Sequence, residues 1–195
     1  MNAQESPSSD HPSADGRGGG DAYDITSRSL PELERHVRET ADSTASPGHW
    51  EQVRDLAVGR MQRNSDAAET RIRWRHLALS ALPKKHSGNT DPKVELAEEV
   101  SIRAYMIRFF GASETDATRQ PSDLCAAIFP QIGMTPAEVT QSAEAWQTKP
   151  REEILQLRRI KNVLSPLLQI KDVLSRDEKV APDIHEWLAL IPQLP

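Results

Sequence analysis

The residues of this chain that could do chemistry are few. Glu32 and His36 are four positions apart, a spacing that places an acid and a base on one face of a helix. Asp183, His185 and Glu186 crowd together, and a histidine beside acids could titrate or act as a base. No nucleophile motif accompanies either group. We therefore predict that Glu32 and His36 form an ordinary pair on a helix surface. Asp183 is predicted to be an acidic residue at the start of a helix.

Metal and nucleotide sites leave patterns that this sequence does not contain. A metal hydrolase or a helical di-metal oxidase needs H-E-x-x-H or repeated E-x-x-H spacing, and neither pattern occurs. The glycine cluster at residues 16–20 lacks the strand and helix that flank a phosphate-binding loop. The single cysteine, Cys125, lies between apolar neighbours and is predicted to be buried. The sequence therefore predicts no catalytic residue, no metal site and no cofactor.

A basic stretch, residues 71–86, is the most distinctive charge feature and contains no acid. Positive charges around a tryptophan could bind phosphates or an acidic partner helix. Positions 71, 73 and 75 point to different sides of a helix, which favours instead a solvent-facing surface paired within the chain. Phosphate binding, an acidic protein partner and a solvent-facing surface therefore all stay open as interpretations of this stretch. The candidate partner-binding residues are Arg71, Arg73, Trp74, Arg75, Lys84 and Lys85.

The segment Leu124 to Trp146 resembles the helix-turn-helix of bacterial regulators. In this resemblance Gly133 lies in the turn, and Thr135 caps the second helix. Pro130 falls inside the first helix of the pattern, and the second helix lacks lysine and arginine for base and phosphate contacts. The resemblance implies a DNA-binding regulator that uses residues 121–149.

The end of the chain is similar to the C-terminal toxin-binding region of antitoxins of the Xre and ParS type. That region pairs a long helix with a short one that contains a Trp-Leu pair, and here a long apolar pattern from Leu157 precedes Trp187-Leu188. The Gly- and Pro-rich continuation after that pair is missing. The resemblance implies an antitoxin-like regulator and assigns no functional residue.

Length and composition fit one domain with a polar tail. The 195 residues suit one domain, but only 37% of them are hydrophobic and the mean hydropathy is −0.61. Residues 1–22 are rich in Ser, Pro, Asp and Gly, which predicts a disordered tail because such a segment buries too little apolar surface. The net charge of −5 gives no general attraction to nucleic acid or anionic membranes.

The expected compartment is the cytoplasm. The first residues contain no apolar core or positive leader of a signal peptide, and no segment approaches the roughly 18 consecutive apolar residues of a membrane helix. One cysteine gives no reason to invoke an oxidising compartment. We therefore expect a protein that neither spans nor enters a membrane.

Apolar residues at spacings of three and four predict helices through the rest of the chain, and no period-two run predicts a strand. Helix starts are predicted near Ser29, Ser46, Asp91, Pro121, Thr135, Pro150 and Pro182. The predicted ends are Ser43, Pro83, Gly111, Phe129, Gln147 and Pro192. Ser165-Pro166 is expected to kink or restart the last long helix, because proline lacks the amide donor.

These elements predict an all-α fold, an irregular bundle of about seven helices behind the tail. Residues 23–195 are predicted to form a single helical domain packed around residues 94–110, with a subdivision near 112–120 as the alternative. The predicted function is a non-enzymatic interaction protein or regulatory adaptor whose partner is another protein. The oligomeric state stays open.

Two other functions stay open. The first is the DNA-binding, antitoxin-like regulator, for which the basic stretch would add phosphate contacts. The second is a helical enzyme whose acids and histidines meet only in space. The residues that could form such a site are Glu98, Glu99, His36, His49, His76 and His185.

Overall fold

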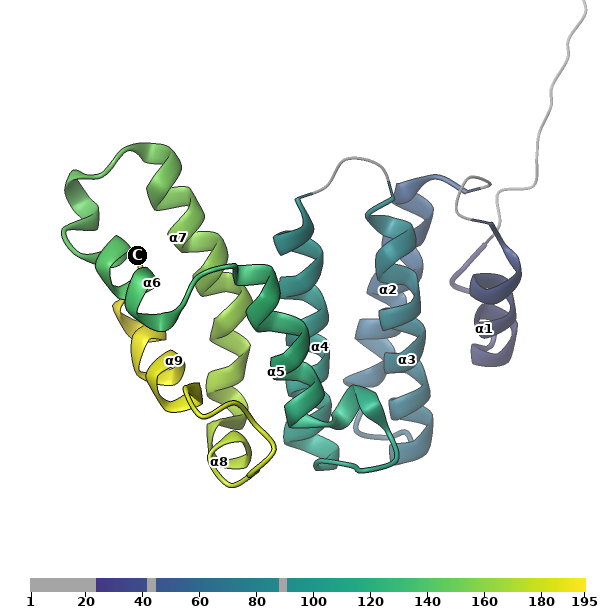
Figure 1. The fold of residues 1–195 in the computed structure, drawn as a ribbon. Helices are drawn as coiled ribbons and strands as arrows, with labels where there is room; N and C mark the ends of the chain where they lie inside the picture. Colours follow the sequence, from purple (N-terminus) through teal and green to yellow (C-terminus); the bar gives the residue numbers. More distant parts are fainter. Residues whose placement is uncertain (1–23, 42–44, 88–90) are drawn as a thin grey trace, which may run out of the picture.

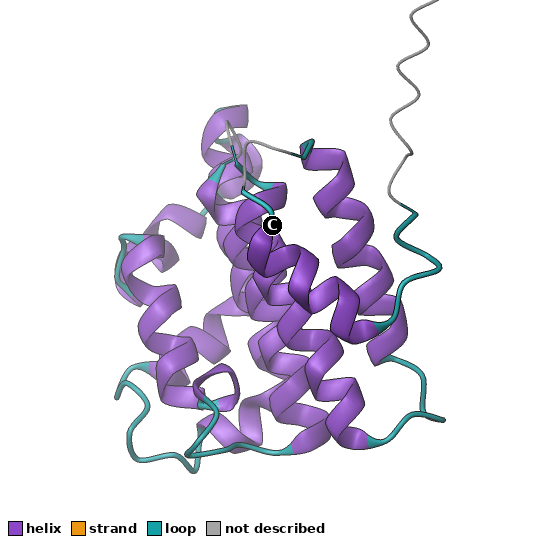
Figure 2. Ribbon diagram, turned by 90° about the vertical axis from the view of Figure 1, so that its right-hand side faces the viewer, coloured by secondary structure: helices purple, strands orange, loops and turns teal. Residues whose placement is uncertain are grey.

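The fold comes from a computed structural model, which describes residues 24–41, 45–87 and 91–195. The tail predicted at residues 1–22 lies outside the described residues. Across the described ranges the chain forms helices and no strand, so the all-α prediction is confirmed (Figure 2). None of the described helices is both long and apolar enough to cross a lipid bilayer. The prediction of a single domain stays a prediction.

The first part of the bundle contains α1 (Leu30–Glu39), α2 (Pro47–Met61) and α3 (Ala68–Lys85). Serine starts the first two helices as predicted: the Ser29 N–H donates to the Glu32 carboxylate at 2.8 Å, and Ser46 Oγ accepts from the His49 N–H at 3.3 Å. The apolar positions predicted for α1 and α2 are buried in one cluster. They are Leu30, Leu33, Val37, Trp50, Val53, Ala57 and Met61.

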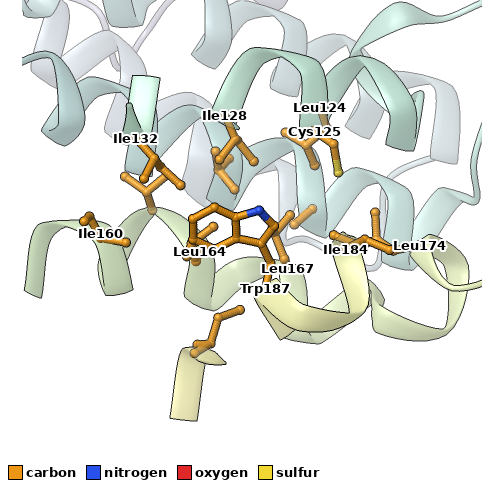
Figure 3. Packing of buried hydrophobic residues seen from close by; sticks show 14 of the residues in the cluster. Leu124, Cys125, Ile128, Ile132, Ile160, Leu164, Leu167, Leu174, Ile184 and Trp187 are labelled. Carbon is orange, nitrogen blue, oxygen red and sulfur yellow. The ribbon is translucent and has the colours of Figure 1, made fainter. Parts of the chain in front are cut away.

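The second part contains α4 (Pro92–Phe110), α5 (Pro121–Ile132), α6 (Pro136–Ala143), α7 (Arg151–Leu164), α8 (Lys171–Leu174) and α9 (Ile184–Leu190). Short 3-10 helices join or extend them: η1 (Ala117–Arg119), η2 (Trp146–Thr148), η3 (Ser165–Ile170) and η4 (Ile191–Gln193). The apolar faces of helices α4 to α9 form a second cluster of buried residues, which surrounds Trp187 (Figure 3).

Helix α4 lies between the two apolar clusters. It packs against α3 on one side and against α5, α7 and η3 on the other (Figure 1). Ile102 and Met106 point into the first cluster, whereas Val100 and Ile107 belong to the second. The prediction that this helix is central is therefore confirmed, because it is apolar around most of its circumference.

Two helices continue through the prolines that were expected to end or interrupt them. Helix α3 runs past Pro83, and the His86 N–H still donates to the Leu82 carbonyl at 3.0 Å. Helix α5 runs past Pro130 to Ile132. A proline in the last turn removes only its own donor, so the neighbouring hydrogen bonds persist. The predicted ends at Pro83 and Phe129 were wrong for this reason.

Other boundaries also differ from the prediction. Helix α6 stops at Ala143 instead of Gln147, because the backbone becomes extended at Glu144 and left-handed at Ala145, where φ is 51°. Helix α1 ends at Glu39, before the expected Ser43. At Ser165-Pro166, where the helix was expected to kink or restart, α7 ends at Leu164 and the chain continues as the 3-10 helix η3.

Two glycines after helices offer a test of backbone conformation. Gly111 follows α4 with φ 79° and ψ 163°, a region almost exclusive to glycine, and Gly133 follows α5 with φ 68° and ψ 17°, the left-handed helical region. An added Cβ would meet no atom within 4 Å at either position. We therefore expect Gly111→Ala to lower the free energy of unfolding by about 1–3 kcal/mol and Gly133→Ala by about 1 kcal/mol.

Urea unfolding followed by circular dichroism measures both values. The two variants serve as matched controls for each other, since each adds one methyl group to open space. Equal losses would contradict the assignment of greater backbone strain to position 111.

Candidate interaction groove

The basic stretch forms most of α3, and its side chains point in several directions. The Arg71 Nε–H donates to the Met61 carbonyl at 3.0 Å, and Lys85 Nζ lies 2.8 Å from Glu98 Oε1 on α4. The Arg73 Nε–H donates to Glu34 Oε1 on α1 at 3.0 Å. The fold therefore divides these charges among α1, α2 and α4.

Trp74 and Arg75, at the centre of the basic stretch, are buried. Trp74 is 6% exposed and Arg75 is 0% exposed. The Arg75 guanidinium carbon lies 3.6 Å from the ring centroid of Tyr105, and Nη1 donates to the Ile102 carbonyl at 3.4 Å. Burial lowers the pKa of Arg75 to about 10, so it is charged at neutral pH. Neither side chain is placed to touch a partner.

A signal for the burial of Arg75 was present in the sequence. Arg75 lies three positions before Ala78 and seven before Leu82, which places it on the apolar face of α3. The charge of Arg75 favoured an exposed position, whereas its helical spacing indicated the core.

A groove of about 360 Å³ lies between α1 and α3. Buried Val37 and Leu77 contribute its apolar side chains. Its other lining residues are Glu34, Arg38, His76, Ser80 and Lys84. We call this cavity the α1–α3 groove.

The charges around the α1–α3 groove are mainly positive. Arg38 is exposed and has no ion pair among the described residues, whereas Glu34 is bound by Arg73. Lys84 Nζ donates to the Thr40 carbonyl at 2.7 Å. The hydrogen bond with Glu34 raises the pKa of Arg73. Arg38 was missed in the sequence because it lies in α1, far along the chain from the basic stretch.

Comparison with known protein families, curated proteins and solved structures finds no match. Three features of the chain itself bear on its function. They are the α1–α3 groove, the segment that resembles a helix-turn-helix, and the acids and histidines that could form a catalytic site.

The helix-turn-helix resemblance corresponds to α5 and α6. Gly133 adopts the left-handed turn conformation, and Thr135 Oγ1 accepts from the Glu138 N–H at 3.3 Å at the start of α6. Helix α6 spans eight residues, none of them lysine or arginine. Trp187, in the segment similar to antitoxins, is 1% exposed and belongs to the second apolar cluster.

The residues proposed for a spatially assembled catalytic site meet only in part. Nε2 of His36 lies 2.7 Å from Nε2 of His49. Glu98, Glu99 and His76 line three different grooves, and His185 is exposed on α9. No group of three or more His, Cys, Asp or Glu side chains that could hold a metal occurs in the part of the chain that the structure describes.

Three other sequence expectations concern single side chains. Glu32 does not pair with His36 as predicted, because it binds the Ser29 N–H at the start of α1 and His36 contacts His49. Asp183 precedes α9 as expected, and its carboxylate accepts a hydrogen bond from Trp187 Nε1 at 3.2 Å. Cys125 is buried as predicted, and burial raises the pKa of its thiol to about 12. An uncharged, buried thiol is a poor nucleophile.

Proposed function

We propose that this chain is a non-enzymatic, cytoplasmic interaction protein that binds an acidic segment of another protein in the α1–α3 groove. The observation that carries the proposal is a cavity with apolar side chains and a mainly cationic rim. Binding sites for protein segments combine buried apolar contacts with charges at the edge that select and orient the partner. A helix or extended segment with acids beside one or two apolar residues fits this chemistry.

The exposed cations of the groove support an acidic occupant. Arg38 has no ion pair among the described residues, so a carboxylate could bind it without breaking an existing pair. Arg73 is exposed and lies beside the groove through its contact with Glu34. Interactions of exposed charges are screened by salt, and this predicts salt-dependent binding.

A labelled amphipathic peptide provides a direct test. The probe carries a stripe of leucine and a face of glutamate, and fluorescence anisotropy measures its binding to the full chain. We expect Arg38→Glu to weaken binding at least fivefold, because it replaces attraction with repulsion at the rim. Ser80→Trp should also abolish most binding, since an exposed serine in the groove becomes a bulky side chain.

The controls separate groove binding from general charge effects. Arg158→Glu makes the same charge change at an exposed position of α7 and should leave binding unchanged. A matching peptide with lysine in place of glutamate should not bind. Equal binding of both peptides, or equal loss in the Arg38 and Arg158 variants, would rule out the groove as the site.

A DNA-binding regulator is the second candidate, supported by the helix, left-handed glycine and capped helix at residues 121–143. Duplex DNA should then be retained at low salt and released steeply as salt rises. Absence of retention at low salt would remove this candidate. Because α6 contains no basic residue, we place the acidic-segment proposal first.

A further inference from the structure

A histidine pair joins α1 to α2 at the edge of the first apolar cluster. The Nε2 atoms of His36 and His49 are 2.7 Å apart, and Nδ1 of His36 lies 3.0 Å from Thr40 Oγ1. Both imidazoles contact the ring of Trp50, with centroid distances of 5.3 Å for His36 and 4.9 Å for His49. Trp50 is 0% exposed, so the pair covers part of the apolar cluster that holds α1.

The geometry of this pair limits how many protons it can hold. A hydrogen bond between two imidazole nitrogens needs a proton on one and a free lone pair on the other. If both rings are imidazolium, two N–H groups face each other and the bond is lost. Two separated histidines each bind an additional proton in acid. While α1 is docked, the hydrogen-bonded pair can bind at most one of these two protons.

Among the described residues, the charges that act on His36 also disfavour a second proton on the pair. Lys84 on α3 lies with Nζ 5.0 Å from the ring centroid of Trp50, and Arg28 precedes α1. Burial, followed by the positive charges of His49, Lys84 and Arg28, lowers the pKa of His36. Burial also lowers the pKa of His49. A second proton on the pair is thus unfavourable while α1 is docked.

We propose that the His36–His49 pair is an acid-sensitive latch, which holds α1 against α2 and α3 near neutral pH and releases it in mild acid. Separated histidines titrate near pH 6.5, so below that pH the released state binds more protons than the docked state. Well below pH 6.5, the ratio of docked to released α1 then falls by about tenfold per pH unit for each excluded proton. Release removes one wall of the α1–α3 groove, but the latch does not depend on what the groove binds.

Hydrogen exchange on the full chain tests the latch. Protection factors of amides in α1, corrected for the intrinsic effect of pH, are compared at pH 6.5 and 5.5 in buffer with EDTA. We expect α1 protection to fall about tenfold while amides in the middle of α4 keep theirs. In the variant His49→Gln, most of this pH-dependent loss of α1 protection should disappear. The glutamine amide can donate a hydrogen bond to neutral His36 or accept one from protonated His36, so the contact is kept in both states.

The matched control is His185→Gln, which removes an exposed histidine from α9 and should retain the full response. Unchanged α1 protection between pH 6.5 and 5.5 in the unmodified chain would overturn the proposal. If His49→Gln leaves α1 unprotected at both pH values, NMR titration of the unmodified chain decides. Loss of α1 protection in step with protonation of His36 and His49 supports the latch, whereas ordinary titration of both with α1 still protected refutes it.

Discussion

Replacing Trp187 with alanine should lower the free energy of unfolding by about 3–5 kcal/mol. The Trp187 side chain is 1% exposed and lies in the middle of the second apolar cluster, among residues of α5, α7 and η3 (Figure 3). Its ring stacks on Phe129 with centroids 5.4 Å apart, and its Nε1–H donates to Asp183. Alanine removes these contacts and leaves a cavity that rigid helices cannot fully close.

Urea unfolding followed by circular dichroism measures this loss. Trp187→Phe should be less costly, because it retains a ring against Phe129 and loses mainly the hydrogen bond to Asp183. Trp146→Ala is a useful control, since Trp146 is only half-buried at the edge of the same cluster. A loss below about 1 kcal/mol for Trp187→Ala would contradict the packing of this cluster.

Replacing Arg75 with alanine should destabilise the fold, whereas replacing it with methionine should not. Arg75→Ala should cost about 2–5 kcal/mol, because it opens a cavity in the first apolar cluster. Arg75→Met should leave the stability unchanged or raise it by about 1–4 kcal/mol, as seen when apolar residues of similar volume replace buried charges. The difference separates the contribution of volume from that of charge.

The contacts of Arg75 explain this expectation. Its Nε and Nη2 atoms are buried without a hydrogen-bond partner, and no carboxylate of a described residue forms an ion pair with it. Stacking on Tyr105 at 3.6 Å stabilises the charge by about 2 kcal/mol, less than the several kcal/mol that desolvation of an ion costs. Methionine keeps the packing and avoids that cost.

Chemical denaturation of both variants tests the prediction. Arg73→Met, at an exposed position two residues earlier, is the control and should change stability by less than about 1 kcal/mol. If Arg75→Met loses as much stability as Arg75→Ala, then the guanidinium itself stabilises the fold. The contact with Tyr105 would then outweigh the cost of burial.

Local features of the sequence predicted the helices. Ser29 and Ser46 precede prolines where helices begin, and the first turn is where a proline costs nothing. The spacing of Trp50, Val53 and Ala57 identified the buried face of α2. Pro83 was misleading, because whether a proline ends a helix depends on the hydrogen bonds that later residues can still form.

The candidate site was predicted only in part. The basic stretch was identified by composition, and the fold divided it into buried residues, ion pairs and the positive rim of the α1–α3 groove. Arg38 could not be added from the sequence, because α1 and α3 become neighbours only when their apolar faces pack together.

The helical character of this chain and the apolar faces of most of its helices could be predicted from the sequence, because propensity, capping and spacing act within a few residues. Polar contacts between residues far apart in the sequence depend on how the helices pack. His36 and His49 are thirteen positions apart and Glu34 and Arg73 are thirty-nine apart, yet both pairs are in hydrogen-bond contact. Such contacts depend on the packing of whole helices, and no local pattern encodes them.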